Sequence, residues 1–344
     1  MWNTSGDNHS QQTANHAVGI LNAANPYIMN FLMFLMMFGM GCGVVLEDLK
    51  KHIKKPVSPA IGAVCQFVLM PLTAFWLAHA LQLEPYQSLG LLIIAAAPGG
   101  TFSNIFTYWV GGDVSLSVFI TTVSTTLAFG TMPLNLFIYS RFWEQKITAI
   151  PYVNITISLV LILIPAALGM VIRYKKEKLA KNLVKAGTVP ALLAIVFSIA
   201  LNIFLYSDIF ASVWEVWLAC ILLCNIGVAQ GFFVAFVCRR TQSERKTIAL
   251  EMGFQNVPLC ISLSATAFHD PTERATTVNV SLLYGLVLVV ELLVVVAIYR
   301  LWKCVRPDAI VDEKVTGSLR WKNDTVTDTP VTSDRGTVNE AYEE

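Results

Sequence analysis

Two short polar strings interrupt apolar stretches of this chain and carry the side chains best suited to chemistry. The first is Pro98-Gly99-Gly100-Thr101-Phe102-Ser103-Asn104, and the second is Glu251-Met252-Gly253-Phe254-Gln255-Asn256-Val257-Pro258. Each places helix-breaking glycine or proline beside oxygen-bearing side chains, which are the ligands that hard cations prefer. At membrane depth, unpaired backbone groups are costly unless they line a cavity or bind something. The two strings therefore predict an ion- or ligand-binding site inside a membrane.

Glu251 is the ionisable residue that argues most strongly for function. A carboxylate deep in a membrane costs at least about 2.5–3.5 kcal/mol and is functional by default. A bound sodium ion would neutralise it. Ser103, Asn104, Gln255 and Asn256 supply further oxygens beside the two breaks. We therefore expect Glu251 to contact an ion or a substrate rather than to form a structural pair.

Other polar residues in the apolar stretches admit two interpretations. Ser117 and Thr121 lie one helical turn apart and can offer hydroxyl ligands, although such residues usually bond a carbonyl of their own helix. Gln66 can be a ligand or form an interhelical hydrogen bond. Gly99-Gly100 can simply allow close helix packing. Glu291 can stay protonated, bond another helix or touch the transport path, with the structural role slightly favoured.

The composition favours an all-α polytopic membrane protein over a soluble domain, since 55% of the 344 residues are hydrophobic and only 14% are charged. Most apolar stretches reach the roughly 20 residues that a bilayer core requires. No cleavable signal peptide is expected, because residues 1–25 are polar. About nine transmembrane helices are predicted, near 27–46, 58–80, 88–109, 114–139, 153–173, 186–206, 214–238, 246–268 and 278–302.

The loops between these spans differ in basic residues, which are retained on the cytoplasmic side of a membrane. Alternate loops hold only Arg141, Lys146 and Arg274. The other connections and the C-terminal exit carry Lys50, Lys51, Lys54, Lys55, Arg173, Lys175, Lys176, Lys178, Lys181, Lys185, Arg239, Arg240, Arg245, Lys246, Arg300, Lys303 and Arg306. The sequence thus predicts a multi-pass protein with an extracellular N-terminus and a cytosolic C-terminus.

The two ends of the chain are polar. Residues 1–26 are expected to form an extracellular tail, in which the sequons at Asn3 and Asn8 make the protein a candidate glycoprotein. Residues 303–344 are rich in acidic and small polar residues and are expected to be a disordered cytosolic tail. The net charge of +1 identifies no partner, and no nucleic-acid partner is expected.

The seven cysteines lie within the predicted spans or at their cytoplasmic ends, so no disulfide framework is implied. Cys220 and Cys224 share a helix face, but two thiols alone are weak evidence for a metal, and buried apolar-like cysteine is favoured. The only metal expected is sodium. An enzyme is not expected, because no nucleophile–base constellation or nucleotide-binding motif is present.

The two polar strings are five spans apart, so they run through the bilayer in opposite directions. This relation is required by an inverted-topology repeat, in which two crossing discontinuous helices form the binding site of a secondary transporter. The alternative from another class is a ligand-binding membrane receptor that keeps the ion sites without turnover.

Several motifs together resemble those of the sodium/bile acid symporter family, in particular its animal members. The match runs over about residues 30–302. It consists of Gln66-Phe67-x-x-Met70-Pro71, Pro98-Gly99-Gly100-x-x-Ser103-Asn104, Gly112-Asp113-x-x-Leu116-Ser117, Thr121-Thr122-x-Ser124-Thr125, Ile150-Pro151-Tyr152 and Glu251-x-Gly253-x-Gln255-Asn256-Val257.

The resemblance implies a core domain that contains the crossing helices and a panel domain that moves against it. The panel would hold spans 27–46, 153–173 and 186–206, and the core the other six. Two sodium ions are implied. One would bind at Ser103, Asn104, Ser117, Thr121 and Glu251, and the other at Gln66, Glu251, Gln255 and the carbonyls of Met252 and Phe254. Asn104 and Asn256 would then contact the substrate.

The resemblance also implies function: sodium-coupled uptake of bile salts or related steroidal anions across the plasma membrane. Three residues depart from the common pattern beside the sites. Family members commonly have a small polar residue at Met252, glutamine at Pro258 and cysteine at Ala97. Sulfated steroids or another small organic anion therefore remain alternative substrates. The oligomeric state stays open.

Overall fold

The computed structural model describes residues 56–100, 102–143, 152–184, 212–268 and 270–305, with scattered positions between 19 and 43 and at 186 and 197. Over these residues the chain is helical, and β-structure is limited to one isolated bridge. Four stretches are long and apolar enough to cross a membrane, namely Val57–Ala80, Val114–Ser140, Trp214–Val237 and Pro271–Val295. The predicted all-α, polytopic class is confirmed to this extent.

Several predictions concern residues outside the described part of the chain. Most of the expected span 186–206 and part of the expected span 27–46 lie outside the described part of the chain, as do the sequons at Asn3 and Asn8 and residues 306–344. The number of nine spans thus stays a prediction. The chain divides into two compact units, residues Met1–Leu292 and residues Leu293–Glu344. All packing described below lies within the first unit.

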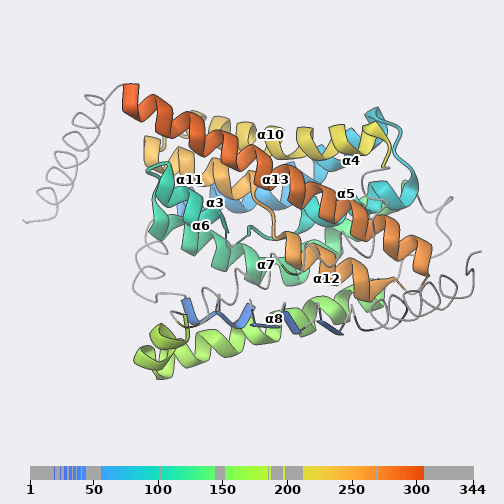
Figure 1. Ribbon diagram of the computed structural model, residues 1–344, viewed down its shortest axis with the longest axis horizontal. Helices are drawn as coiled ribbons and strands as arrows, with labels where there is room; N and C mark the ends of the chain where they lie inside the picture. Colours follow the sequence, from blue (N-terminus) through green and yellow to red (C-terminus); the bar gives the residue numbers. More distant parts are fainter. Residues whose placement is uncertain are drawn as a thin grey trace, which may run out of the picture. The chain divides into compact units, whose positions relative to one another are not determined.

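The two expected breaks are confirmed, because each of the predicted spans 88–109 and 246–268 is a pair of short helices (Figure 1). The helices are α3 (Val57–Val64), the π-helix η1 (Cys65–Leu69), α4 (Met70–Ala80), α5 (Pro85–Ala96), α6 (Phe102–Trp109), α7 (Val114–Ser140), α8 (Tyr152–Lys175), α10 (Trp214–Val237), α11 (Gln242–Gly253), α12 (Val257–Ala267) and α13 (Pro271–Val305). The first break separates α5 from α6, and the second separates α11 from α12.

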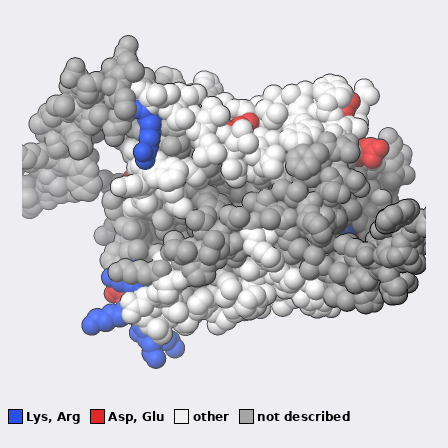
Figure 2. All heavy atoms as spheres, in the orientation of Figure 1, with Lys and Arg blue, Asp and Glu red and all other residues white. Residues whose placement is uncertain are grey.

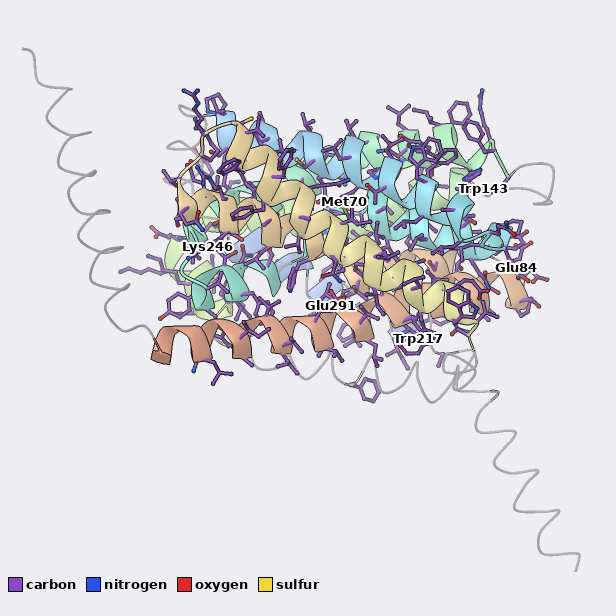
Figure 3. The ribbon with its side chains drawn as sticks, turned by 90° about the horizontal axis from the view of Figure 1, so that it is seen from above. Met70, Glu84, Trp143, Trp217, Lys246 and Glu291 are labelled. Carbon is purple, nitrogen blue, oxygen red and sulfur yellow. The ribbon has the colours of Figure 1, made fainter. Side chains whose placement is uncertain are left out.

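The two interrupted pairs begin with the same local chemistry. Glu84 and Gln87 form a capping box at the start of α5, and Thr241 and Glu244 form one at the start of α11. Figure 3 shows Glu84 and Lys246, which lies in the second turn of α11, at opposite ends of the helices. Helices α5 and α11 therefore start at opposite ends and each stops at its break in the middle.

Helix α10 approaches α11 very closely. A Cβ added to Gly231 would lie 2.9 Å from the Ile248 carbonyl oxygen, and one added to Gly227 would lie 3.0 Å from the Met252 carbonyl oxygen. These glycines are spaced Gly-x-x-x-Gly, and small residues at this spacing let membrane helices pack backbone to backbone. The result is that α10 supports the C-terminal end of α11 directly, next to the second break.

Candidate ion-binding site at the crossover

The two breaks meet in space and pair with each other. Gly99 and Gln255 form an antiparallel bridge. The Gly100 amide donates to the Phe254 carbonyl at 2.7 Å, and the Asn256 amide donates to the Pro98 carbonyl at 3.0 Å. These bonds satisfy backbone groups that the helix ends leave free, which is a requirement in a membrane interior. The pairing places the polar residues of both strings around one point.

Glu251 lies at this point, fully buried, with three hydroxyls around its carboxylate. Ser103 and Ser117 donate to Oε2 at 2.6 and 3.1 Å, and Thr121 donates to Oε1 at 2.5 Å. The hydroxyls come from the first turn of α6 and from consecutive turns of α7. The structure thus brings together four residues that the sequence analysis assigned to one cation site.

Two of these hydroxyls also lie within hydrogen-bond distance of a carbonyl of their own segment. Ser103 Oγ is 2.7 Å from the Gly100 oxygen, and Thr121 Oγ1 is 3.0 Å from the Ser117 oxygen. A hydroxyl has one proton and two lone pairs. When a cation binds to the carboxylate, each proton can turn to the carbonyl and each lone pair can face the cation. The backbone bond and the ligand role of Thr121 are therefore compatible.

Gly99 is the residue that allows the carboxylate to lie this close to the crossover. A Cβ at position 99 would lie 2.3 Å from Glu251 Oε1 and 2.9 Å from its carboxyl carbon. A Cβ at Gly100 would lie 2.7 Å from the Gln255 carbonyl oxygen. The two glycines permit close packing, as one interpretation held, and what packs against Gly99 is the Glu251 carboxylate.

A second polar cluster is centred on Gln66, which lies in the π-helix η1. Its Nε2 donates to the Ala97 carbonyl at 2.5 Å and to Gln255 Oε1 at 2.7 Å, and Gln255 Nε2 donates to the Met252 carbonyl at 2.8 Å. Single π-turns inside helices often occur at functional sites. The structure joins Gln66 to the second break by hydrogen bonds, so the interhelical bond expected for Gln66 is confirmed and its ligand role stays a prediction.

The carbonyls of Met252 and Phe254 each already accept one hydrogen bond, from Gln255 Nε2 and from the Gly100 amide. A carbonyl oxygen has two lone pairs. One lone pair on each therefore remains for a cation. The link between this cluster and Glu251 runs through the backbone from position 251 to position 255.

Three buried polar atoms at the crossover have no hydrogen-bond partner among the residues that the structure describes. They are Gln66 Oε1, Asn104 Oδ1 and Asn256 Nδ2. An unpaired buried group costs about 1–3 kcal/mol and calls for an explanation. The two oxygens are acceptors, which suit a cation, and the nitrogen is a donor, which suits an anion. Asn256 Oδ1 is already used, because it caps α12 by accepting from the Leu259 amide at 3.2 Å.

Two further residues of this region were not predicted from the sequence. Thr107 is fully buried, and its Oγ1 lies 3.4 Å from Ser117 Oγ. Its position four residues after Ser103 places both on one helix face, a signal that was available in the sequence. Tyr284 donates from its hydroxyl to the Gly253 carbonyl at 2.6 Å. No local pattern in α13 indicates this contact.

Glu291 lies in α13 and interacts with the Cys224 thiol of α10. It accepts a hydrogen bond of 2.7 Å from Asn225 Nδ2 of α10. The interhelical bond that was slightly favoured for Glu291 is therefore present.

Comparison with known proteins decides between the classes that such a site allows. Residues 30–213 match the family described as Sodium Bile acid symporter family. The chain belongs to this family. The resemblance found in the motifs is thus confirmed, and the family is one of transporters.

Curated relatives carry two kinds of name. The chain is 36% identical to the ileal sodium/bile acid cotransporter of Mus musculus over 281 aligned residues. The alignment covers 81% of this chain and 80% of the relative. It is 36% identical over 268 residues to the ileal sodium/bile acid cotransporter of Homo sapiens, covering 78% and 77%. It is also 37% identical over 290 residues to the sodium-dependent organic anion transporter of Homo sapiens, covering 83% and 76%.

Proposed function

We propose that this member of the family is a sodium-coupled symporter of bile salts or related steroidal organic anions, working by alternating access in the plasma membrane. The observation that carries the proposal is the fully buried Glu251 carboxylate, which three hydroxyls surround where two broken helices cross. A cation is the ligand that such a carboxylate requires at membrane depth. The names of the relatives support sodium as that cation.

Two sodium ions are assigned to the crossover. The first binds at Glu251 with the three hydroxyls of Ser103, Ser117 and Thr121 and with Asn104. The second binds at Gln66, Gln255, Glu251 and the carbonyls of Met252 and Phe254. The unpaired Oδ1 of Asn104 and Oε1 of Gln66 support one site each, because a cation would satisfy them.

The substrate anion is assigned to the two helix starts at the crossover. Helices α6 and α12 both begin there, and the first amides of a helix attract negative charge. Asn104 lies in the first turn of α6, and Asn256 caps α12 with an unused Nδ2. These two residues would contact the anionic group once the sodium ions fix the crossover.

The charge balance of such a cycle makes uptake respond to the membrane potential. Two sodium ions and one monovalent anion carry one net positive charge inward. A potential of 100 mV then contributes about 2.3 kcal/mol to each cycle, in addition to the sodium gradient.

The proposed architecture is an inverted repeat of about nine spans, with a panel that includes α8 and a core that includes the crossover helices. Helix α8 packs against α7 and α12, so it is placed to move against them. Figure 2 shows the basic side chains that follow α8 gathered beyond one end of this helix. Their position supports a cytosolic location for that end and an extracellular N-terminus.

The leading substrate class is tested by uptake of labelled anions in cells or proteoliposomes, with sodium or with choline. We expect sodium-dependent uptake of a bile salt such as taurocholate. Uptake of a sulfated steroid in its place would support the alternative substrate, which the departures at Ala97, Met252 and Pro258 and the relative named as an organic anion transporter favour. Binding without sodium-dependent flux of any anion would contradict transport and leave the receptor interpretation.

The two sodium sites are tested by separate substitutions. Ser117→Ala combined with Thr121→Ala removes two ligands of the first site, and Gln66→Ala removes one ligand of the second. Because occupancy of either site stabilises the shared crossover, each variant should raise the sodium concentration for half-maximal uptake, by about three- to tenfold. The measurement is uptake over a range of sodium concentrations, normalised to surface protein.

Thr131→Ala is the matched control, because this exposed hydroxyl of α7 bonds only the Leu127 carbonyl of its own helix. It should leave the sodium dependence unchanged. Wild-type sodium dependence in both test variants, with only a lower maximal rate, would show that these polar residues are packing groups.

A further inference from the structure

Tyr284 is a fully buried residue of α13 whose hydroxyl contacts the backbone of the crossover and the Cys224 thiol. It is among the largest of the fully buried side chains, and it donates to the Gly253 carbonyl at 2.6 Å. A buried tyrosine hydroxyl usually finds such a partner. What distinguishes this partner is its position, because Gly253 is the last residue of α11 and lies directly at the second break.

A second helix contacts the same carbonyl. The Cys224 thiol of α10 lies 3.6 Å from the Gly253 oxygen. Helices α10 and α13 therefore both direct a donor at one carbonyl of the crossover. The last carbonyls of a helix lack intrahelical donors, and in a membrane they need other partners. The two donors supply them for Gly253.

The hydrogen bond fixes more than one atom, because a peptide unit is planar. The unit that carries the Gly253 carbonyl also carries the Phe254 amide, which donates to the Leu250 carbonyl at 2.9 Å. Both ends of this plane are thus held. The plane lies between the carbonyls of Met252 and Phe254, which are the two backbone ligands assigned to the second sodium ion.

The residue at this point must be a glycine, which makes an external restraint necessary. A Cβ on Gly253 would lie 2.4 Å from Val228 Cγ2 of α10. Glycine, however, has more accessible backbone conformations than any other residue. Close packing against α10 therefore requires a flexible glycine, Gly253, between the two proposed carbonyl ligands. The Tyr284 hydroxyl limits the backbone freedom of this glycine.

We propose that Tyr284 is a positioning residue of the second sodium site: its hydroxyl holds the peptide unit between Gly253 and Phe254 so that the flanking carbonyls face the ion. The inference rests on the proposed sodium coupling. Tyr284 itself does not touch the ion and acts through the backbone.

Tyr284→Phe tests the role, since it keeps the buried ring and removes only the oxygen. In proteoliposomes we expect the sodium concentration for half-maximal uptake to rise about three- to tenfold, with the maximal rate per transporter kept at saturating sodium. In detergent, the rise in melting temperature produced by sodium relative to choline should shift to correspondingly higher sodium concentration. The melting temperature in choline alone measures any loss of packing.

Tyr139→Phe is the matched control. Tyr139 lies in α7, and its ring packs on the ring of Phe75 with a centroid distance of 5.3 Å. Tyr139→Phe therefore removes the same hydroxyl as Tyr284→Phe, but at a position remote from the crossover. It should leave both sodium curves unchanged. A second test variant, Cys224→Ala, removes the weaker donor and should raise the half-saturating sodium concentration about twofold.

The sodium curves and melting temperatures of these variants distinguish a positioning role of Tyr284 from a packing role. A lower melting temperature in choline with unchanged sodium curves would overturn the positioning role and leave Tyr284 as a packing residue. If Tyr284→Phe does not fold, an unchanged sodium curve for Cys224→Ala overturns it instead. A wild-type protein without any sodium response would overturn the proposed function and this inference together, whereas a sodium-responsive wild type with an insensitive Tyr284→Phe overturns only the inference.

Discussion

Glu251→Gln is expected to lower sodium-dependent uptake more than about a hundredfold while the protein still reaches the cell surface. The amide keeps the size of the side chain and can still accept from Ser103 and Ser117, but it carries no charge. Breaking a buried pair of opposite charges costs about 3–5 kcal/mol, and 1.4 kcal/mol corresponds to a factor of ten. Both proposed sodium sites share this carboxylate, so neither can compensate. Uptake at several sodium concentrations, with surface biotinylation, is the measurement.

Glu291→Gln is the matched control for this change. It makes the same replacement in a membrane helix, and the amide can still accept from Asn225 Nδ2. We expect a much smaller loss of uptake than at Glu251, because Glu291 is not a proposed sodium ligand and its amide can keep the hydrogen bond from Asn225. Normal sodium affinity in a well-expressed Glu251→Gln protein, or an equal loss in both variants, would contradict the role of Glu251.

Gly99→Ala is expected to reduce uptake at least about tenfold, although it adds only one methyl group. That methyl would lie 2.3 Å from Glu251 Oε1 and 2.9 Å from the carboxyl carbon, so the carboxylate or the crossover backbone must move. Displacement of a ligand by even a fraction of an ångström weakens a site in which several oxygens must converge. Overpacking of this kind typically costs about 1–3 kcal/mol. Sodium-dependent uptake and melting temperature would both report it.

Gly130→Ala in α7 provides the control, because nothing lies within 4 Å of an added Cβ at that position. It should leave uptake and sodium affinity unchanged. A Gly99→Ala protein with wild-type sodium affinity would show that the carboxylate does not need to lie against the backbone of the first break.

Much of the site was predictable from the sequence because it depends on residue types that are unusual in a membrane. Glycine, proline, amides and a carboxylate in two apolar stretches leave few structural explanations. The positions of both helix breaks, the all-α class and the choice of Glu251, Ser103 and Gln255 as candidate site residues follow from this chemistry. The family also followed from the sequence, because its motifs are combinations of these same residues.

The partners of each residue depended on the tertiary structure. The sequence places Ser117 and Thr121 on one helix face, but only the packing of α7 against α6 and α11 brings their hydroxyls to Glu251. Gln66 is one amide among several in the sequence, and it is the π-helix together with the first break that joins it to Gln255. For Glu291 the sequence favours a structural role only slightly, and the packing of α10 is what places Asn225 beside it.

Two broken helices and a buried carboxylate within a membrane protein follow from the amino-acid sequence, because the cost of burying such groups restricts what they can be. The close approach of Gly99 to the carboxylate, the pairing of the breaks through Gly100 and Asn256, and the contact of Tyr284 with the Gly253 carbonyl follow only from the folded chain. Contacts between residues far apart in the chain depend on how helices pack, and helix packing depends on shape over whole surfaces rather than on any local pattern.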